Sequence, residues 1–304
     1  MNESNPKVSI GLPVYNGENY VAEAIESVLA QTFVDFELVI VDNASTDRTQ
    51  EICEYYEAKD PRVSYYRNSV NLGAAGNFNR AFELSSAKYF KWLAHDDVIA
   101  QDFLEKCVEV LDSDPSVVLC FTNVGVIDEN GQQIDKYDIN LRTDSVDPSE
   151  RFRALVVDWH LCLDIFGLIR SDALSQTPVM GNYGHGDGVL LVRLGLIGKF
   201  HKIHEYLFFS RRHPTQSMRV FGYALDEGGN DYHAYVVWFD PSKRGKIVFP
   251  QWRILTEYFK SIWTYRLGWA ERLRCQLYLL WWVAKNRKNF WYDIRAFGKT
   301  LFSI

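Results

Sequence analysis

The chain has 304 residues, of which 47% are hydrophobic and 24% charged, as expected of a soluble globular protein with a sizeable core. Its formal net charge of −6 argues against a nucleic-acid-binding protein. The charge is unevenly distributed, because residues 251–304 hold ten Lys/Arg against three Asp/Glu, and also six of the nine Trp. A basic, aromatic segment on an acidic body predicts a surface-binding extension at 251–304.

The five cysteines show no spacing typical of a disulfide framework or a zinc site, so we expect reduced core residues. The N-terminal sequence lacks the pattern of a signal peptide. The longest apolar run, Leu277–Ala284, is much shorter than a membrane span. We therefore expect a cytoplasmic protein that can lie peripherally on the inner face of the cell membrane.

The first part of the chain alternates strand and helix patterns, with apolar runs in the strands and apolar residues at helical spacing between them. The expected strands are Val8–Pro13, Phe36–Val41, Val63–Arg67, Tyr89–Leu93 and Val117–Asp128. The expected helices are Asn19–Gln31, Thr49–Lys59, Asn77–Ser86 and Phe103–Leu111. Repeated strand–helix units predict an α/β fold with a mostly parallel central sheet flanked by helices.

The pattern changes after residue 128. Glu129–Gly131 is typical of a hairpin turn, Asp147–Val157 of a helix opened by proline, and Gly181–Gly188 of a glycine-rich loop. A helix at Val189–Leu196 and a bent strand at Phe200–Arg211 follow. The segment from Gly222 to Gly245 is rich in turn residues, and the remainder has helical spacing.

Polar residues follow four of the expected strands, at Tyr15–Gly17, Asp42–Asn43, Asn68–Asn71 and Asp96–Asp97. Because ligands bind beyond the carboxyl ends of parallel strands, these four clusters predict one binding site. A dinucleotide-binding fold would place Gly-x-Gly-x-x-Gly after the first strand. This chain has the sequence PVYNG there, which argues against that fold.

Six segments, in this order, resemble family 2 glycosyltransferases of the GT-A fold: VSIGLPVYNGENYVAEAIESVLAQTF, FELVIVDNASTDRT, NLGAAGNFNRA, KWLAHDDV, the Gly186-Asp187 pair and RRHPTQS. The resemblance covers about residues 6–220. It implies an inverting enzyme that transfers a sugar from a nucleotide-diphosphate sugar, with UDP as the expected nucleotide, to a saccharide or lipid-linked acceptor in polysaccharide or glycoconjugate biosynthesis.

The resemblance also implies a domain organisation. We expect a GT-A catalytic domain at 1–220, with a nucleotide-sugar-binding half at about 1–97 and an acceptor-side half at about 98–220. A linker is expected at 221–250 and a basic aromatic helical extension at 251–304.

Asp42 ends the second expected strand, where a carboxylate can accept a hydrogen bond from the uracil N–H of a nucleotide. By the resemblance this position contacts the base, and the stretch from Pro13 to Tyr15 lines the same pocket. Two alternatives stay open: Asp42 starts the turn and caps the helix at Ser45, and Tyr15 packs without stacking on the base. The remaining donor-binding residues implied by the resemblance are Asn71, Gly73, Asn79, Arg80, Asp96, Arg211 and Arg212.

Asp96 and Asp97 are the expected ligands of a divalent cation, Mn or Mg, that neutralises the charge of the departing diphosphate. The family's cluster reads Leu-Asp-x-Asp-Asp, whereas this chain has Ala94 in place of the first acid, which weakens the case for tight metal binding. We hypothesise that His213 joins the metal ligands and partly replaces that acid. The alternative for the two aspartates is a helix cap.

Asp187 lies in the glycine-rich loop and matches the family's catalytic base. By the resemblance it deprotonates the acceptor hydroxyl, mainly by orientation and late proton acceptance. The alternative is an N-cap for Val189–Leu196. Arg211 and Arg212 resemble the family's Arg-x-His segment near the diphosphate and would stabilise the departing phosphates, unless they form a solvated basic loop.

Six apolar residues of the C-terminal segment follow helical spacing among Lys and Arg, which favours an interfacial helix that attracts anionic lipids. The alternative is a helical pair packed on the catalytic domain or a partner chain. The six spaced residues are Tyr258, Ile262, Tyr265, Trp269, Leu273 and Leu277.

Two other functions also stay open. A nucleotidyltransferase would need a glycine- and basic-rich first loop, which is absent. A non-catalytic sugar-nucleotide-binding or assembly protein is favoured by Ala94, but the presence of Asp187 argues against it.

Overall fold

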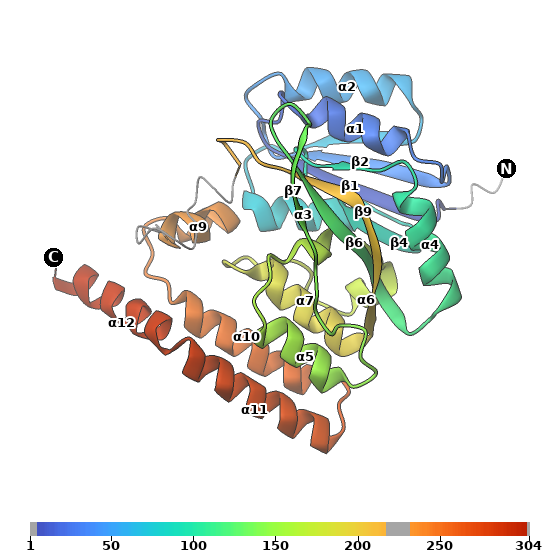
Figure 1. Cartoon of the computed structure of the whole chain (residues 1–304). Helices are drawn as coiled ribbons and strands as arrows, with labels where there is room; N and C mark the ends of the chain where they lie inside the picture. The colour runs from blue at the N-terminus through green and yellow to red at the C-terminus, as the bar shows by residue number, and fades with distance from the viewer. Residues whose placement is uncertain (1–4, 217–231, 303–304) are drawn as a thin grey trace.

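The computed structural model describes residues 5–216 and 232–302, and shows a central sheet with helices packed around it (Figure 1). The strands are β1 (Val8–Val14), β2 (Phe36–Asp42), β3 (Val63–Arg67), β4 (Tyr89–Trp92), β5 (Val98–Ile99), β6 (Val117–Ile127), β7 (Gln133–Tyr137), β8 (Leu168–Arg170) and β9 (Lys199–Arg211). The main helices are α1 (Val21–Leu29), α2 (Thr49–Lys59), α3 (Gly73–Glu83), α4 (Phe103–Ser113), α5 (Pro148–Val157), α6 (Ser171–Ser175), α7 (Gly186–Ile197), α9 (Tyr232–Phe239), α10 (Pro250–Thr264), α11 (Trp269–Lys285) and α12 (Arg287–Phe302). Short 3-10 helices lie at η1 (Leu163–Phe166) and η2 (Pro241–Lys243).

Four strands at one end of the sheet pair in parallel, in the order β3-β2-β1-β4. Every residue of β1 is buried, and so is nearly all of β2, because helices cover both faces of this part of the sheet. Figure 1 shows α1 and α2 on one side of these strands and α3 on the other. Burial on both faces explains why these strands are continuous apolar runs without alternation.

The second part of the sheet is mixed. β8 pairs antiparallel between β4 and β6, β9 runs parallel to β6, and β5 pairs antiparallel with β9. β7 forms the expected hairpin with β6. The predicted α/β class, with helices flanking a central sheet, is confirmed, and the antiparallel pairs are an addition to it. Strands as short as β5 and β8 give no readable periodicity in the sequence.

The C-terminal helices pack on α5 and α7, in the second part of the fold. α10 lies against α7, and α11 lies against α5 and α10 (Figure 1). Tyr258, Ile262 and Cys275 are buried, and they belong to the same hydrophobic core as the sheet. The alternative of helices packed on the catalytic domain therefore holds for one face of the extension. None of the described helices is both long and apolar enough for a membrane span.

Part of the predicted linker is helical. Residues 221–231 lie outside the described residues, but 232–250 include α9, η2 and the start of α10. α9 packs against α3 through Tyr235 and Phe239, which contact Ala75 and Met180. All five cysteines are buried and unpaired, as predicted.

Candidate active site

The loops that follow β1 and β2 are tied to each other by backbone-to-side-chain hydrogen bonds. The amide of Asn16 donates to Ser45 Oγ at 2.9 Å, and the amide of Thr46 donates to Asn16 Oδ1 at 2.8 Å. Gly17 N donates to Thr49 Oγ1 at 2.8 Å. Two of the predicted polar clusters therefore lie together at the carboxyl edge of the sheet.

Asp42 caps the turn after β2. Its carboxylate accepts hydrogen bonds from Ser45 N at 2.8 Å and from the Tyr65 hydroxyl at 2.7 Å, and Arg67 Nε lies 3.3 Å away. Burial, together with the hydrogen bond to Asp42, raises the pKa of Tyr65. The side chain of Asp42 is fully buried and holds the turn, but α2 begins at Thr49 with Arg48 as its N-cap, so Asp42 does not cap that helix. Contact with a nucleotide base stays a prediction.

Pro13 and Tyr15, both predicted to line the base pocket, differ in exposure. Pro13 is buried in β1, where it pairs in register with Val41 of β2. Tyr15 lies just beyond the strand and is 45% exposed. Its ring is therefore accessible to a planar base, whereas Pro13 shapes the strand beneath it.

A network of asparagine side chains orders the next cluster, and the sequence interpretation did not recognise it. Asn68 Nδ2 donates to Asn43 Oδ1 at 3.2 Å and to Asn77 Oδ1 at 2.8 Å. Asn43 Nδ2 donates to Asn71 Oδ1 at 3.0 Å, and Asn77 Nδ2 donates to Val41 O at 2.8 Å. The only local signal was an asparagine after each of two strands, which is common in ordinary turns.

Gly73 begins α3 with φ at +79°, a conformation that favours glycine. Its amide donates to Asn71 Oδ1 at 2.8 Å. A Cβ at this position would lie 2.6 Å from the carbonyl oxygen of Phe239 at the end of α9. Gly73 thus allows the close approach of α9 to the start of α3.

Asp96 and His213 face each other at the ends of β4 and β9. His213 Nε2 lies 3.0 Å from Asp96 Oδ2, and its Nδ1 lies 3.0 Å from Thr215 Oγ1. Both residues are buried, and the ring of Tyr20 packs against the imidazole at 4.8 Å between centroids. Burial acts to raise the pKa of Asp96, but the hydrogen bond from His213 and the nearby histidine charges outweigh it and lower the pKa.

Asp97 has a different environment from Asp96. Its Oδ1 accepts a hydrogen bond from the backbone amide of Arg211 at 2.9 Å. Burial and the neighbouring charge of Asp96 raise the pKa of Asp97. Of the three predicted metal ligands, the structure thus brings Asp96 and His213 together and directs Asp97 to the backbone of β9.

Arg211 anchors the edge of the site from inside the protein. Its guanidinium donates to Asp96 O at 2.8 Å, to Asp128 O at 3.1 Å and to Glu23 Oε2 at 2.6 Å. The residue is fully buried. All three guanidinium nitrogens therefore have protein acceptors in this structure, and contact of Arg211 with a phosphate stays a prediction.

Three other predicted donor-binding residues have different environments: Arg212, Asn79 and Arg80. Arg212 is exposed and lies 3.5 Å from Asp135 Oδ2. Asn79 exchanges two hydrogen bonds of 2.9 Å with the backbone of Met180, so it positions the segment before the glycine-rich loop. The Nε atom of Arg80 is buried and has no hydrogen-bond partner among the described residues.

Asp187 lies in the first turn of α7, with its side chain 29% exposed. Its Oδ1 accepts a hydrogen bond from Gly188 N at 2.8 Å. α7 begins at Gly186, and the N-cap residue is His185, so the N-cap alternative for Asp187 is wrong. At this exposure the carboxylate of Asp187 is accessible from solvent.

Other polar groups lie around Asp187. Oxygen, sulfur and nitrogen atoms of Cys162, His185 and Asp187 lie within 4.8 Å of one another. Asp164 is 1% exposed, and neither of its carboxylate oxygens has a hydrogen-bond partner among the described residues. His160 Nδ1 lies 3.9 Å from Asp164, and burial raises the pKa of Asp164.

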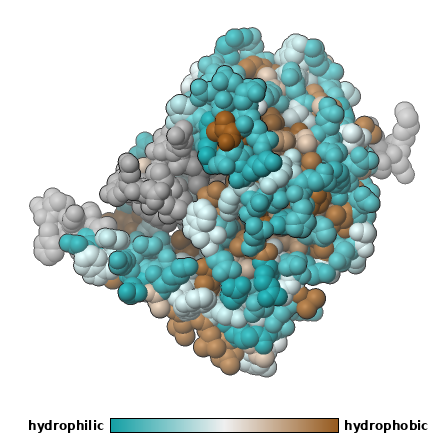
Figure 2. Space-filling view, in the orientation of Figure 1, coloured by the Kyte–Doolittle hydropathy of each residue, from teal (hydrophilic) through white to brown (hydrophobic). Residues whose placement is uncertain are grey.

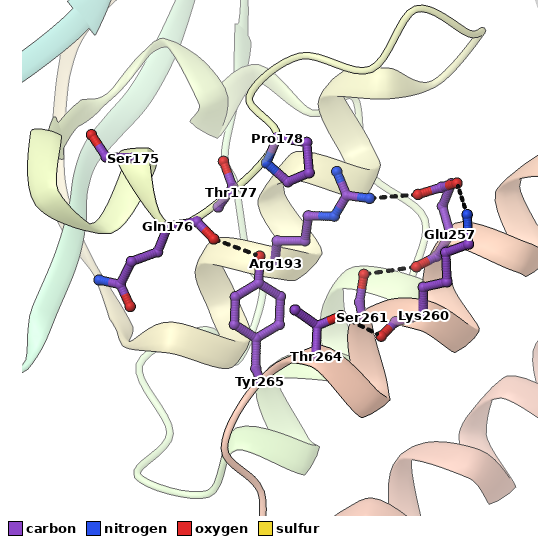
Figure 3. Close-up of a pocket in the computed structure, with 10 residues that line it drawn as sticks. All are labelled: Ser175, Gln176, Thr177, Pro178, Arg193, Glu257, Lys260, Ser261, Thr264 and Tyr265. Carbon is purple, nitrogen blue, oxygen red and sulfur yellow. Dashed lines mark hydrogen bonds and ion pairs between the residues drawn. The ribbon is translucent and has the colours of Figure 1, made fainter.

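A cavity of about 420 Å³ lies between the end of α6, α7 and α10 (Figure 3). Its wall includes the buried ion pair between Arg193 Nη2 and Glu257 Oε2, at 2.6 Å, with Lys260 3.1 Å from the other oxygen of Glu257. None of its described lining residues belongs to the predicted site.

Comparison with known proteins gives a family match. The protein-family model described as "Glycosyl transferase family 2" matches residues 9–177 of the chain. An uncharacterized glycosyltransferase of Rickettsia typhi is 34% identical over 237 residues, which cover 74% of this chain and 70% of that protein. A candidate teichuronic acid biosynthesis glycosyltransferase of Bacillus subtilis, TuaG, is 34% identical over 137 residues. That match covers 45% of this chain and 54% of TuaG, so the chain spans about half the length of TuaG.

Solved structures share the fold. The crystal structure of S. aureus TarS 1–349 in complex with UDP matches with a TM-score of 0.56 at 17% identity, covering 97% of this chain and 92% of that one. The mannosyltransferase PcManGT of Pyrobaculum calidifontis, in complex with GDP-Man and Mn²⁺, matches with a TM-score of 0.50 at 16% identity. That match covers 93% of this chain and 88% of PcManGT, and at these identities the likeness concerns the fold alone.

Proposed function

The chain belongs to glycosyltransferase family 2, and on this premise we propose that it transfers a sugar from a UDP sugar to an acceptor hydroxyl, with inversion at the anomeric carbon. The observation that carries the proposal is the pairing of Asp96 with His213 at the edge of the sheet. Structures with this fold contain UDP, UDP-GlcNAc or GDP-Man, which supports a nucleotide-sugar donor. The relationship to TuaG supports a role in polysaccharide biosynthesis.

The proposed reaction is a single displacement. The acceptor O–H bond breaks as its oxygen forms a bond to the anomeric carbon, and the bond from that carbon to the diphosphate oxygen breaks. The electron pair of the broken bond leaves with the diphosphate, and the proton moves to the Asp187 carboxylate. Asp187 supports this role because its side chain is partly exposed and lies in the first turn of α7.

Asp96 and His213 fit a divalent cation. Two neighbouring ligands of an octahedral ion at about 2.1 Å from the metal lie ~3.0 Å apart, which matches the separation of Asp96 Oδ2 and His213 Nε2. A carboxylate with an imidazole favours Mn²⁺ over Mg²⁺, since Mg²⁺ prefers oxygen ligands. The cation, when bound, would neutralise charge on the departing diphosphate.

We further propose that the extension contacts a membrane surface with anionic lipids, where it would meet a lipid-linked acceptor. Five large apolar residues share one exposed face of α11, which we call the α11 stripe, and Figure 2 shows apolar residues gathered over that region at the lower edge. Arg272 stacks on Trp263 and Trp269 beside it. Apolar side chains bordered by basic groups are typical of interfacial helices. The stripe consists of Trp269, Leu273, Leu277, Leu280 and Trp281.

Diphosphate release and sugar transfer across a panel of nucleotide sugars, with Mn²⁺ or Mg²⁺, test the proposed activity. Asp187→Asn should lower turnover by about 10²- to 10⁴-fold while donor binding is kept. Glu109→Gln, which removes an exposed carboxylate on α4, is the charge control and should be unaffected. The activity is refuted if no donor yields nucleoside diphosphate, and the role of Asp187 is refuted if the Asn variant is fully active.

A further inference from the structure

His185 is held against Asp187 by an unusual backbone conformation. Its φ of +68° places a non-glycine residue in the left-handed region, a conformation that L side chains rarely adopt. Such conformations concentrate at functional sites. A Cβ on Gly188 would collide with the imidazole of His185, and a Cβ on Gly186 would collide with the backbone of Gly181. The glycines of this loop thus make room for the ring.

The extension supplies a further restraint on the same ring. The hydroxyl of Tyr258, on α10, lies 3.1 Å from His185 Nε2. Tyr258 is 1% exposed, and its ring packs edge-on against Phe152 of α5 and Trp282 of α11. A rigid aromatic group from α10 therefore fixes one nitrogen of the imidazole.

The other nitrogen of the ring faces Asp187. His185 Nδ1 lies 3.9 Å from Asp187 Oδ1, which is longer than a hydrogen bond. Catalytic hydrogen bonds are often long before substrate binds. Burial lowers the pKa of His185 despite the nearby charge of Asp187. A neutral imidazole carries one N–H, and if Nε2 accepts from the Tyr258 hydroxyl, that N–H is on Nδ1, the nitrogen nearer Asp187.

We propose that His185, anchored by Tyr258, is a positioning residue for Asp187, whose carboxylate it orients toward the acceptor hydroxyl. This inference rests on the proposed function, because it presumes that Asp187 receives the acceptor proton. His185 keeps its own proton throughout, so the atom and electron balance of the displacement is unchanged. The extension thereby contributes to the geometry of the active site through α10.

Two substitutions separate the imidazole from the backbone conformation. Glycine tolerates a positive φ, so His185→Gly keeps the loop conformation and removes the ring. Asparagine also tolerates the left-handed region, and its Nδ2 can donate from about the position of Nδ1. If His185 matters only for the path of the loop, both variants should behave like the wild type.

The experiment measures kcat, and KM for donor and acceptor, in the full chain. We expect His185→Gly to lower kcat by about 10- to 100-fold with little change in the donor KM, whereas His185→Asn retains most of the activity. Tyr258→Phe should lower kcat by a smaller factor. Thermal melting establishes that each variant is folded, and ¹⁵N NMR of the wild type should show the Nδ1–H tautomer of His185.

Wild-type kcat in folded His185→Gly, or the Nε2–H tautomer in the wild type, would overturn the positioning role. Equal impairment of the folded Gly and Asn variants would overturn it too. Full activity of Asp187→Asn would instead overturn the base assignment of the proposed function. The two failures are therefore distinguishable by which variant keeps its activity.

Discussion

The Nε2 atom of His213 lies 3.0 Å from Oδ2 of Asp96, although 117 residues separate them in the sequence. The short strand β5 explains this proximity. Val98 and Ile99, which directly follow Asp96 and Asp97, pair antiparallel with Phe209 and Phe208 of β9. That pairing brings the end of β9 close to the end of β4, so that His213 lies beside Asp96. The motif of the family has a further acidic residue two positions before Asp96, where this chain has Ala94.

If Asp96 and His213 share a cation, His213→Ala should raise the Mn²⁺ concentration for half-maximal activity by about 10-fold or more. Initial rates over a Mn²⁺ titration measure this, and Asp96→Asn should show a larger effect. Thr215→Val, which removes only the hydroxyl beside Nδ1, should have the smallest effect. An unchanged Mn²⁺ dependence in folded His213→Ala would remove His213 from the metal ligands.

Arg211 and Arg212 are adjacent, yet they should respond differently to truncation. Arg211→Ala leaves the carbonyl groups of Asp96 and Asp128 without their donor, whereas the half-exposed Glu23 can be solvated, so we expect a loss of about 2–4 kcal/mol in the free energy of unfolding. Arg212→Ala removes an exposed contact with Asp135 and should change stability by less than about 0.5 kcal/mol. Urea denaturation measures both. Similar stability of the two variants would contradict the structural role of Arg211.

The buried carboxyl of Asp164 should make stability depend on pH. Its pKa is higher in the folded than in the unfolded protein, so its contribution is most favourable below the unfolded value of 3.8 and is lost as the pH rises through the folded value. Asp164→Asn should therefore melt at a higher temperature than the wild type at pH 8, with the gain shrinking toward pH 5.

Asp114→Asn provides a control of opposite sign. Hydrogen bonds from Ser116, with the nearby Lys199, lower the pKa of Asp114 to about 2, so its stabilising contribution is present above the unfolded pKa and lost as the pH falls. This variant should melt lower than the wild type at pH 8. A pH-independent difference between Asp164→Asn and the wild type would show that the Asp164 carboxyl does not titrate as inferred.

Membrane contact through the α11 stripe is testable without deleting α10, whose buried face belongs to the core. Leu273→Glu with Leu277→Glu places two charges at exposed positions and should lower partition into anionic vesicles by at least ~10-fold. Partition of the wild type should fall with added salt. Sedimentation with vesicles of phosphatidylglycerol or of neutral lipid measures both effects.

The matched control is Val34→Glu with Ile134→Glu, two exposed apolar positions away from the extension. This control should partition like the wild type. Equal partition of the stripe variant and the wild type would exclude the membrane proposal. Self-association of the wild type that the stripe substitutions abolish would instead assign the surface to a second copy of the chain.

The sequence by itself determined the local elements and the family. α2 and β3 have the predicted bounds, because each is a single uninterrupted pattern of apolar spacing between turn residues. Asp96 and Asp187 were identified from motifs contiguous in the chain. The start of α7 was misplaced by three residues, since glycine at Gly186 and Gly188 suggested loop where packing around His185 allows helix.

Tertiary structure alone decided which polar side chains of the site are available to a ligand. Arg211 donates a hydrogen bond to Glu23, and Asn79 donates one to the backbone of Met180. His185 is hydrogen-bonded to Tyr258 of the extension. Each of these contacts joins residues far apart in the chain, and their formation depends on how strands and helices pack. Periodicity reports the geometry of neighbouring residues, whereas the burial and partners of a polar group are set by distant ones.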